Sequence, residues 1–291
     1  MRAQPGLVSG TWQMAEALRR VLDAGCAARP EGDGASGPPL LLLGAPRSAQ
    51  TSLLFAAALE AAGEGRGPVL FLTRRPLQSL PLNTPAAREP WRLQKVRFQY
   101  PSSVPELLQL LASAHEASGP APSLLLLDGL EDYLAEDSGA QEAAYLAALL
   151  LDTVAYFSHH LGASGSCGLV VALETLKEAD GDIPHLTLLQ RYFPAQCWLQ
   201  PDALGLGQQY CLRASLASGP LSPRMEWSVT FLPSGEMKIT PWPTQASKPC
   251  SDRKGSSARS QSLTLARDNL SGPQCPLDRT LTSGTGAESK T

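Results

Sequence analysis

Apolar runs and helical patterns alternate along the first two thirds of the chain. Five runs have the length of buried strands: LLLLG (40–44), VLFLT (69–73), VRFQY (96–100), SLLLLDG (123–129) and GLVVAL (168–173). Helical patterns separate several of them, at 51–63, 105–117 and 141–162. Continuous apolar strands that alternate with helices are typical of a parallel sheet covered on both faces. The pattern therefore predicts an α/β domain.

The pattern changes after residue 195. Four segments, at 195–201, 209–216, 225–232 and 236–242, alternate apolar and polar residues and are separated by short turn signals. Such alternation is typical of antiparallel strands joined by hairpins. We expect an antiparallel β meander that extends the mostly parallel sheet, within one domain that covers residues 39–243.

Two flanking regions differ from this domain. Residues 1–38 form an N-terminal extension with a Gly/Pro linker and one amphipathic helix. The helix places five residues near one face: Met14, Leu18, Val21, Leu22 and Cys26. It either packs on the flank of the domain or docks a partner. Residues 244–291 are rich in Ser, Thr, Gly, Arg and Lys, which predicts a disordered tail.

Composition narrows the class of protein. The net charge of -3 divides into an acidic body and a mildly basic tail, which argues against a generally basic nucleic-acid coat. The six cysteines form no C-x-x-C pair and there are four histidines, so we expect no intrinsic zinc site. No apolar run approaches the roughly 20 residues of a membrane span, and no signal peptide is evident. We expect a soluble intracellular protein with no membrane contact.

The segment from the first apolar run into the following helix resembles a phosphate-binding P-loop, G-x-x-x-x-G-K-[ST]. Gly44 and Thr51 match the pattern, whereas Ala49 replaces its second glycine and Gln50 its lysine. The candidate nucleotide-binding residues are Gly44, Ala45, Pro46, Arg47, Ser48, Ala49, Gln50, Thr51, Ser52 and Asp128.

The two replacements weaken the expected chemistry. Alanine costs about 1–2 kcal/mol if the position requires a positive φ. Glutamine donates hydrogen bonds without charge, and losing a charge-assisted bond weakens phosphate binding by roughly 1.5–3 kcal/mol. Arg47 is either a replacement cation or a solvent-exposed loop residue. Thr51 keeps the hydroxyl that Mg²⁺ needs.

Asp128 ends the apolar run SLLLLDG, where P-loop enzymes place the carboxylate that orders Mg²⁺. The plainer interpretation is an aspartate that begins a turn after a buried strand. Thr51 and Asp128 are therefore the candidate metal residues, with ATP and Mg²⁺ as the candidate cofactors.

Several blocks resemble a known family. They are LLLLGAPRSAQTSLLFAAALEAAGEG (40–65), GPVLFLTRRPLQS (67–79), RLQKVRFQYP (92–101), SLLLLDGLEDYLAED (123–137) and LLQRYFPAQCWLQPD (188–202). Over roughly residues 14–243 the chain resembles the SWIM-domain-associated ATPase of the vertebrate Shu complex, a divergent paralogue of the RecA-type recombinases.

The resemblance implies a RecA-like P-loop fold and a stable heterodimer with a SWIM zinc-finger protein. It also implies contact with the recombinase and its paralogues, binding of single-stranded DNA, and homologous recombination repair of DNA damage in the nucleus, including meiosis. An ATPase stimulated by single-stranded DNA is implied as well.

Three positions depart from the catalytic pattern of that family. The P-loop has Ala49-Gln50 where the family has Gly-Lys. Arg74 and Arg75 stand nearest to the place of the water-activating glutamate, and Glu174 stands where a neutral amide senses the γ-phosphate. We therefore expect weak or absent ATP hydrolysis and assign no catalytic residue.

The densest positive run lies between residues 74 and 97. Its DNA-binding candidates are Arg74, Arg75, Arg88, Arg92, Lys95 and Arg97, opposed by Glu89 and interleaved with Trp91, Phe98 and Tyr100. Cations beside aromatic rings suit single-stranded DNA. The alternative is a solvated edge loop whose aromatic residues belong to the core. The acidic segment Glu131, Asp132, Glu136 and Asp137 would repel DNA.

Other motifs have plain interpretations. Phe55 to Ala58 matches the F-x-x-A pattern by which recombinase subunits dock, but its place in a helix favours core packing. His159 and His160 are interpreted as the polar end of a helix. Trp227 and Trp242 are assigned to packing in preference to a partner surface.

Three functions stay open from the sequence. The first is a RecA-like scaffold subunit with little turnover, and the second is an active single-stranded-DNA-stimulated ATPase. The third is a small P-loop kinase, which would need an Arg-rich lid where this chain has the acidic segment 131–137.

Overall fold

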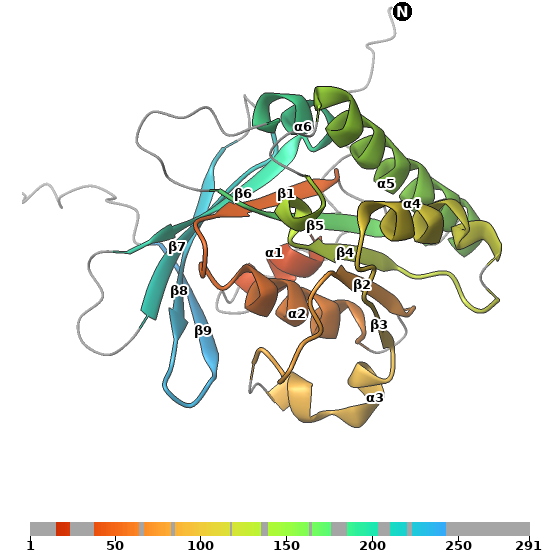
Figure 1. The fold of residues 1–291 in the computed structure, drawn as a ribbon. Coiled ribbons are helices and arrows are strands. Elements are labelled where there is room, and N and C mark those ends of the chain that lie inside the picture. The colour runs from red at the N-terminus through yellow and green to blue at the C-terminus, as the bar shows by residue number, and fades with distance from the viewer. Residues whose placement is uncertain are drawn as a thin grey trace, which may run out of the picture. The chain divides into compact units, whose positions relative to one another are not determined.

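Nine strands form one sheet in the order β3-β2-β4-β5-β1-β6-β7-β8-β9 (Figure 1). The strands are β1 (Leu40–Gly44), β2 (Val69–Thr73), β3 (Val96–Gln99), β4 (Leu124–Asp128), β5 (Gly168–Glu174), β6 (Ala195–Pro201), β7 (Tyr210–Ala217), β8 (Met225–Phe231) and β9 (Met237–Pro241). All pairs from β3 to β6 are parallel, and those from β6 to β9 are antiparallel. The fold class predicted from the sequence is confirmed.

This computed structural model describes residues 16–23, 38–63, 67–82, 85–116, 118–134, 139–162, 165–175, 185–202, 210–219 and 223–242. The described residues belong to one compact unit, Met1–Thr244. Met14, Cys26, Glu136, Asp137 and the tail 244–291 lie outside them. The predicted domain boundaries stay a prediction.

The predicted antiparallel meander holds from β6 to β9, but β6 also has a parallel neighbour that the sequence did not indicate. The alternating pattern at 195–201 was assigned to antiparallel pairing, yet β6 pairs in parallel with β1 along one edge, with Leu40 opposite Ala195. Only its other edge is antiparallel, to β7. A period of two reports which residues face the core, and it carries no information on the direction of the neighbouring strand.

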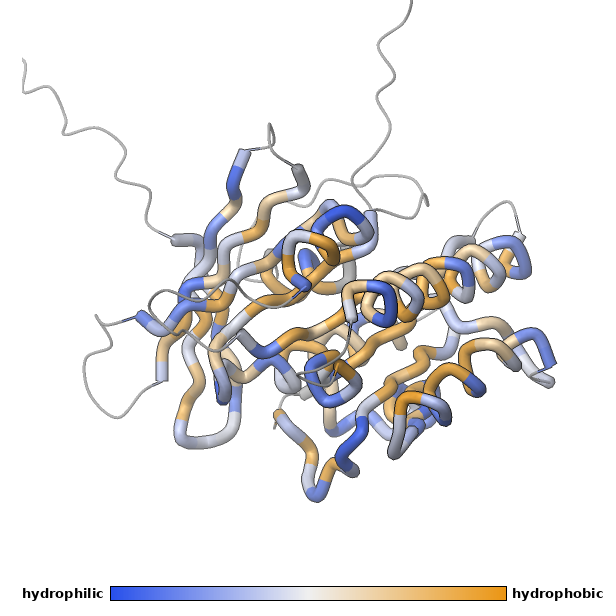
Figure 2. Tube along the Cα trace, turned by 45° about the horizontal axis from the view of Figure 1, so that its top comes forward, coloured by the Kyte–Doolittle hydropathy of each residue, from blue (hydrophilic) through white to orange (hydrophobic). Residues whose placement is uncertain are grey.

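Helices cover both faces of the parallel part (Figure 1). They are α1 (Glu16–Asp23), α2 (Gln50–Ala61), α3 (Pro90–Leu93), α4 (Val104–Ala112), α5 (Ala140–Leu161) and α6 (Leu186–Tyr192), with 3-10 turns η1 (Pro85–Arg88), η2 (Ala114–Glu116) and η3 (Leu130–Tyr133). Alternate leucines of β1 point to opposite sides, so Leu42 belongs to the core beneath α2, and Leu43 to the core beneath α5. The central strands are accordingly hydrophobic throughout (Figure 2).

The flank-packing interpretation of the first helix holds, because Leu18 and Leu22 of α1 are buried in the same core as α2 and β9. Phe55 and Ala58 of α2 are fully buried, so the F-x-x-A pattern is part of the core, as expected. Trp227 is buried too.

Candidate functional site

The candidate residues gather at the carboxyl ends of the parallel strands. Gly44 at the end of β1 lies opposite Glu174 at the end of β5. Thr73 at the end of β2 lies opposite Asp128 at the end of β4. Open α/β sheets bind their ligands at this edge. The sequence prediction that the P-loop and Asp128 share one edge of a parallel sheet therefore agrees with the structure.

The P-loop backbone has a cradle-like shape. A Cβ atom on Gly44 would lie 2.2 Å from Ser48 Oγ and 3.0 Å from Ser48 Cβ, so a larger residue here would force Ser48 to shift. Arg47 and Ala49 have φ values of 65° and 57°, in the left-handed region. Left-handed residues that alternate with others turn successive N–H groups to one side, which creates an anion-binding nest. Ala49 thus occupies a conformation that favours glycine, and the strain expected from the sequence is present.

Gln50 has a structural role that the sequence did not reveal. Its amide nitrogen donates to the main-chain oxygens of Leu42, at 3.0 Å, and Leu173, at 2.9 Å. Both hydrogens of the amide are therefore used, and the side chain is buried. At the position of the P-loop lysine, this chain has a cross-link between β1 and β5 in place of a phosphate ligand.

Thr51 and Asp128 form the pair predicted to hold Mg²⁺. Thr51 Oγ1 donates to Asp128 Oδ2 at 2.7 Å. Burial raises the pKa of Asp128 to about 6, although the hydrogen bond from Thr51 acts in the opposite direction. A hydroxyl and a carboxylate in contact suit a Mg²⁺ ion bound with a nucleotide. Ser52 is directed elsewhere, since its hydroxyl donates to the main-chain oxygen of Pro81.

A cavity of about 440 Å³ opens above the P-loop. Its charged lining residues are Arg47, Arg75, Asp128, Glu131, Asp132 and Glu174. Four carboxyl groups thus face two guanidinium groups. A nucleotide is itself negatively charged and would be repelled by these carboxyl groups. Tight binding therefore requires that a divalent cation binds with the nucleotide or that the carboxyl groups are protonated.

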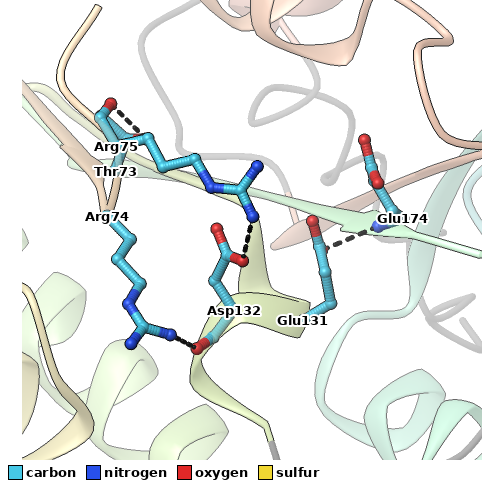
Figure 3. A network of polar contacts seen from close by, with 6 residues as sticks. All are labelled: Thr73, Arg74, Arg75, Glu131, Asp132 and Glu174. Atoms are coloured by element: carbon cyan, nitrogen blue, oxygen red, sulfur yellow. Dashed lines mark hydrogen bonds and ion pairs between the residues drawn. The ribbon is translucent and has the colours of Figure 1, made fainter.

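A polar network links the end of β2 with the turn η3 (Figure 3). Arg74 Nη1 donates to the main-chain oxygen of Asp132 at 2.6 Å, and Arg75 Nη2 lies 2.9 Å from Asp132 Oδ1. Glu131 Oε2 accepts from the backbone N–H of Glu174 at 2.8 Å. Burial is the main cause that raises the pKa of Glu131 to about 7.

The positive run at 74–97 is divided between places in the fold. Arg74 and Arg75 follow the carboxyl end of β2, whereas Lys95 precedes the amino end of the parallel strand β3. Arg97 is exposed on β3 beside a second cavity of about 560 Å³. The structure therefore does not bring the six cations into one patch.

Arg92 and Lys95 lie beside one partly exposed aromatic ring. Arg92 Nη1 donates to the oxygen of Leu59 at 3.0 Å, and Lys95 Nζ to that of Gly63 at 3.3 Å, at the end of α2. Trp91 lies under both cations, 4.8 Å from the guanidinium and 5.3 Å from the ammonium. Trp91 is 37% exposed. Two of the six candidate cations thus lie beside an exposed ring, and their binding of DNA stays a prediction.

Two groups of the site escaped sequence reasoning. The sequence indicates Glu131 as part of an acidic segment that would repel DNA, whereas in the structure it lines the cavity and accepts a hydrogen bond from the end of β5. The signal available was its position three residues after Asp128, at the start of a short turn. The role of Gln50 left no signal, because the bond partners are main-chain atoms.

Membrane spans, metal-ligand clusters and the paired histidines are the remaining features in the described ranges. No helix there is long and apolar enough to cross a membrane. No group of three His, Cys, Asp or Glu side chains in that part of the chain has the arrangement of a metal site. His159 and His160 are exposed at the end of α5, where they were expected.

Comparison with known proteins gives the family. No protein-family model matches the chain. The mouse protein named ATPase SWSAP1 is 81% identical over 278 residues, which cover 96% of this chain and 100% of the mouse protein. The chain belongs to the SWSAP1 family. The human protein of the same name is 69% identical over 228 residues, which cover 78% of this chain and 99% of the human protein.

Solved structures show the fold that this SWSAP1-family chain adopts. One match is a DnaB-like replicative helicase, from a structural study of the helicase and its interactions with primase. Its TM-score is 0.50 at 13% identity, over 77% of this chain and 68% of the helicase. The RadB recombinase has a TM-score of 0.49 at 14% identity, over 70% of this chain and 92% of RadB. The fold is RecA-like, as the resemblance implied.

Proposed function

We propose that the chain is the RecA-like subunit of a Shu-type complex. It pairs with a SWIM zinc-finger protein, contacts the recombinase and its paralogues, and binds single-stranded DNA in homologous recombination repair in the nucleus, including meiosis. The observation that carries this proposal is the 81% identity with mouse ATPase SWSAP1 over the full length of that protein.

The proposed subunit retains a nucleotide site but hydrolyses ATP slowly or not at all. The loop backbone and the Thr51–Asp128 pair support nucleotide and Mg²⁺ binding. A bound nucleotide would supply the transferable phosphoryl group. Two features argue against fast hydrolysis. Both N–H donors of the Gln50 amide are used by main-chain oxygens. Arg75 lies near the expected place of the water-activating glutamate.

The second candidate is an active ATPase stimulated by single-stranded DNA. It is supported by the word ATPase in the names of both relatives and by the intact contact between Thr51 and Asp128. A small P-loop kinase is disfavoured, because Glu131 and Asp132 occupy the rim of the cavity where a lid of arginines would be needed.

Two measurements test the proposal. The first is copurification of the SWIM protein with the tagged full chain from cells, which the complex requires and whose absence would contradict it. The second is phosphate release with and without single-stranded DNA. We expect a rate near that of buffer; a DNA-stimulated rate that Asp128→Ala abolishes would favour the active ATPase.

A further inference from the structure

The cavity above the P-loop needs a cation that its own loop pattern no longer supplies. Gln50 is neutral, and its amide is hydrogen-bonded to Leu42 and Leu173 in the sheet. A phosphate chain in a P-loop needs positive charge as well as backbone N–H groups. Among the described residues that line this cavity, the cationic side chains are Arg47 and Arg75.

Arg75 lies at the rim of the cavity, where its guanidinium can contact a ligand. It follows β2, whose last residue, Thr73, lies opposite Asp128. Its Nη2 pairs with Asp132 Oδ1 at 2.9 Å, while 82% of its side chain remains exposed. A guanidinium has five N–H donors, so one ion pair leaves donors for a phosphate.

Arg47 comes from the loop itself. Its backbone is left-handed, and its main-chain oxygen accepts a hydrogen bond from the hydroxyl of Tyr210 at 3.2 Å. This contact fixes the loop backbone against the start of β7. The Arg47 side chain is exposed and lines the cavity, so it adds a second guanidinium to the lining.

We propose that Arg75, assisted by Arg47, neutralises the phosphates of a nucleoside di- or triphosphate bound in this cavity, in place of the P-loop lysine. This inference rests on the proposed function, specifically on the retained nucleotide site. The phosphates compete with Asp132 for the Arg75 guanidinium, whose remaining donors are open to them. Mg²⁺ is required, because Asp128, Glu131 and Glu174 stay close to the bound anion.

The neighbouring arginine provides a matched control. Arg74 contacts the same residue as Arg75, but through the main-chain oxygen of Asp132. It does not line the cavity. Figure 3 shows the two guanidinium groups leaving the end of β2 in different directions. A general effect of positive charge on the protein would be the same for both residues, whereas phosphate contact distinguishes them.

The test measures binding of fluorescent ATP and ADP, with Mg²⁺, to the full chain copurified with its partner. Arg75→Ala is expected to weaken affinity at least tenfold, as loss of a charge-assisted contact does. Arg74→Ala should stay within twofold of the unmodified chain. Asp132→Asn, which frees Arg75 while keeping the size of the side chain, should tighten binding by about two- to fivefold.

Competition with inorganic tripolyphosphate identifies the part of the ligand that is recognised. If tripolyphosphate displaces the fluorescent nucleotide from the unmodified chain, and does so less effectively from Arg75→Ala, then Arg75 contacts the phosphates. Thermal melting of every variant checks that the fold is retained, which the exposure of Arg75 favours.

Three outcomes would overturn the inference: equal losses in Arg74→Ala and Arg75→Ala, an unchanged affinity in Arg75→Ala, or no nucleotide binding by the unmodified chain. The third outcome would also remove the proposed nucleotide site. The proposed complex stands in all three cases if the SWIM protein still copurifies. Failure of copurification in the unmodified chain would instead remove the proposed function.

Discussion

Ala49 shows at the scale of one residue how the loop differs from a standard P-loop. Its φ of 57° places an alanine in the left-handed region. Ala49→Gly should raise the free energy of unfolding by about 1 kcal/mol, because relief of the strain exceeds the entropy that glycine adds to the unfolded chain. Urea denaturation measures the change. Ala45→Gly, in the same loop without a positive φ, should give no gain, and an equal gain there would contradict the assignment.

Gln50 gives a prediction of opposite sign. Gln50→Leu removes both donors and leaves the oxygens of Leu42 and Leu173 without their side-chain partner. Both oxygens keep their main-chain partners in the β1–β5 ladder, so neither is left unsatisfied. Loss of two hydrogen bonds, each worth about 0.5–1.5 kcal/mol, should lower stability by roughly 1–3 kcal/mol in urea denaturation. Gln78→Leu, on the exposed rim of the cavity, is the control and should change stability little. A neutral effect at Gln50 would mean that the cross-link has no energetic role.

Among the elements, helix α2 has two roles: it belongs to the candidate site and it packs in the core. It begins in the P-loop, and its face bearing Phe55 forms the core. Phe55→Ala should destabilise the domain by about 3–5 kcal/mol, as truncation of a buried aromatic does. Circular dichroism during thermal melting reports the loss, and Tyr145→Ala, at an exposed ring on α5, serves as comparison.

The same substitution bears on partner docking. Reduced recombinase binding by Phe55→Ala would follow from loss of the fold and would not identify a docking motif. If the variant melted like the unmodified chain, the burial described for Phe55 would be wrong.

Elements were predicted from the sequence wherever hydrophobic period and length agree. The run LLLLG is β1 residue for residue, and VLFLT is β2. The parallel pairing of β6 with β1 was missed because these two strands come from distant parts of the chain. In the site, Gly44, Thr51 and Asp128 were found because side-chain chemistry fixes their pattern. The bonds of Gln50 were not, because any sequence supplies main-chain oxygens.

At the scale of the whole molecule, the carboxyl groups of the cavity make stability depend on pH. The pKa of Asp128 rises from 3.8 to about 6, and that of Glu131 from 4.5 to about 7. The folded protein thus keeps protons that the unfolded chain releases. Their contribution to stability is complete below about pH 4 and is lost as pH rises through 6 and 7.

Glu131→Gln should remove much of this dependence. The amide oxygen can still accept the N–H of Glu174, and no charge develops on the variant side chain. As the pH rises from 4.5 to 8, the free energy of unfolding of the variant should increase relative to that of the unmodified chain by on the order of 2 kcal/mol. Urea denaturation at a series of pH values measures the difference. Glu142→Gln, at an exposed site on α5, should show no such trend.

The strand order has a consequence for the synthesis of the protein on the ribosome. β1 lies between β5 and β6, with Leu40 opposite Val170 on one side and Ala195 on the other. About 130 further residues must therefore emerge before β1 finds its first neighbour, on the order of 10 s at the usual rate of translation. During this interval its four leucines have no sheet to join. An apolar strand without its neighbours for this time is prone to aggregation, so we expect the chain to be most vulnerable before its second half has emerged.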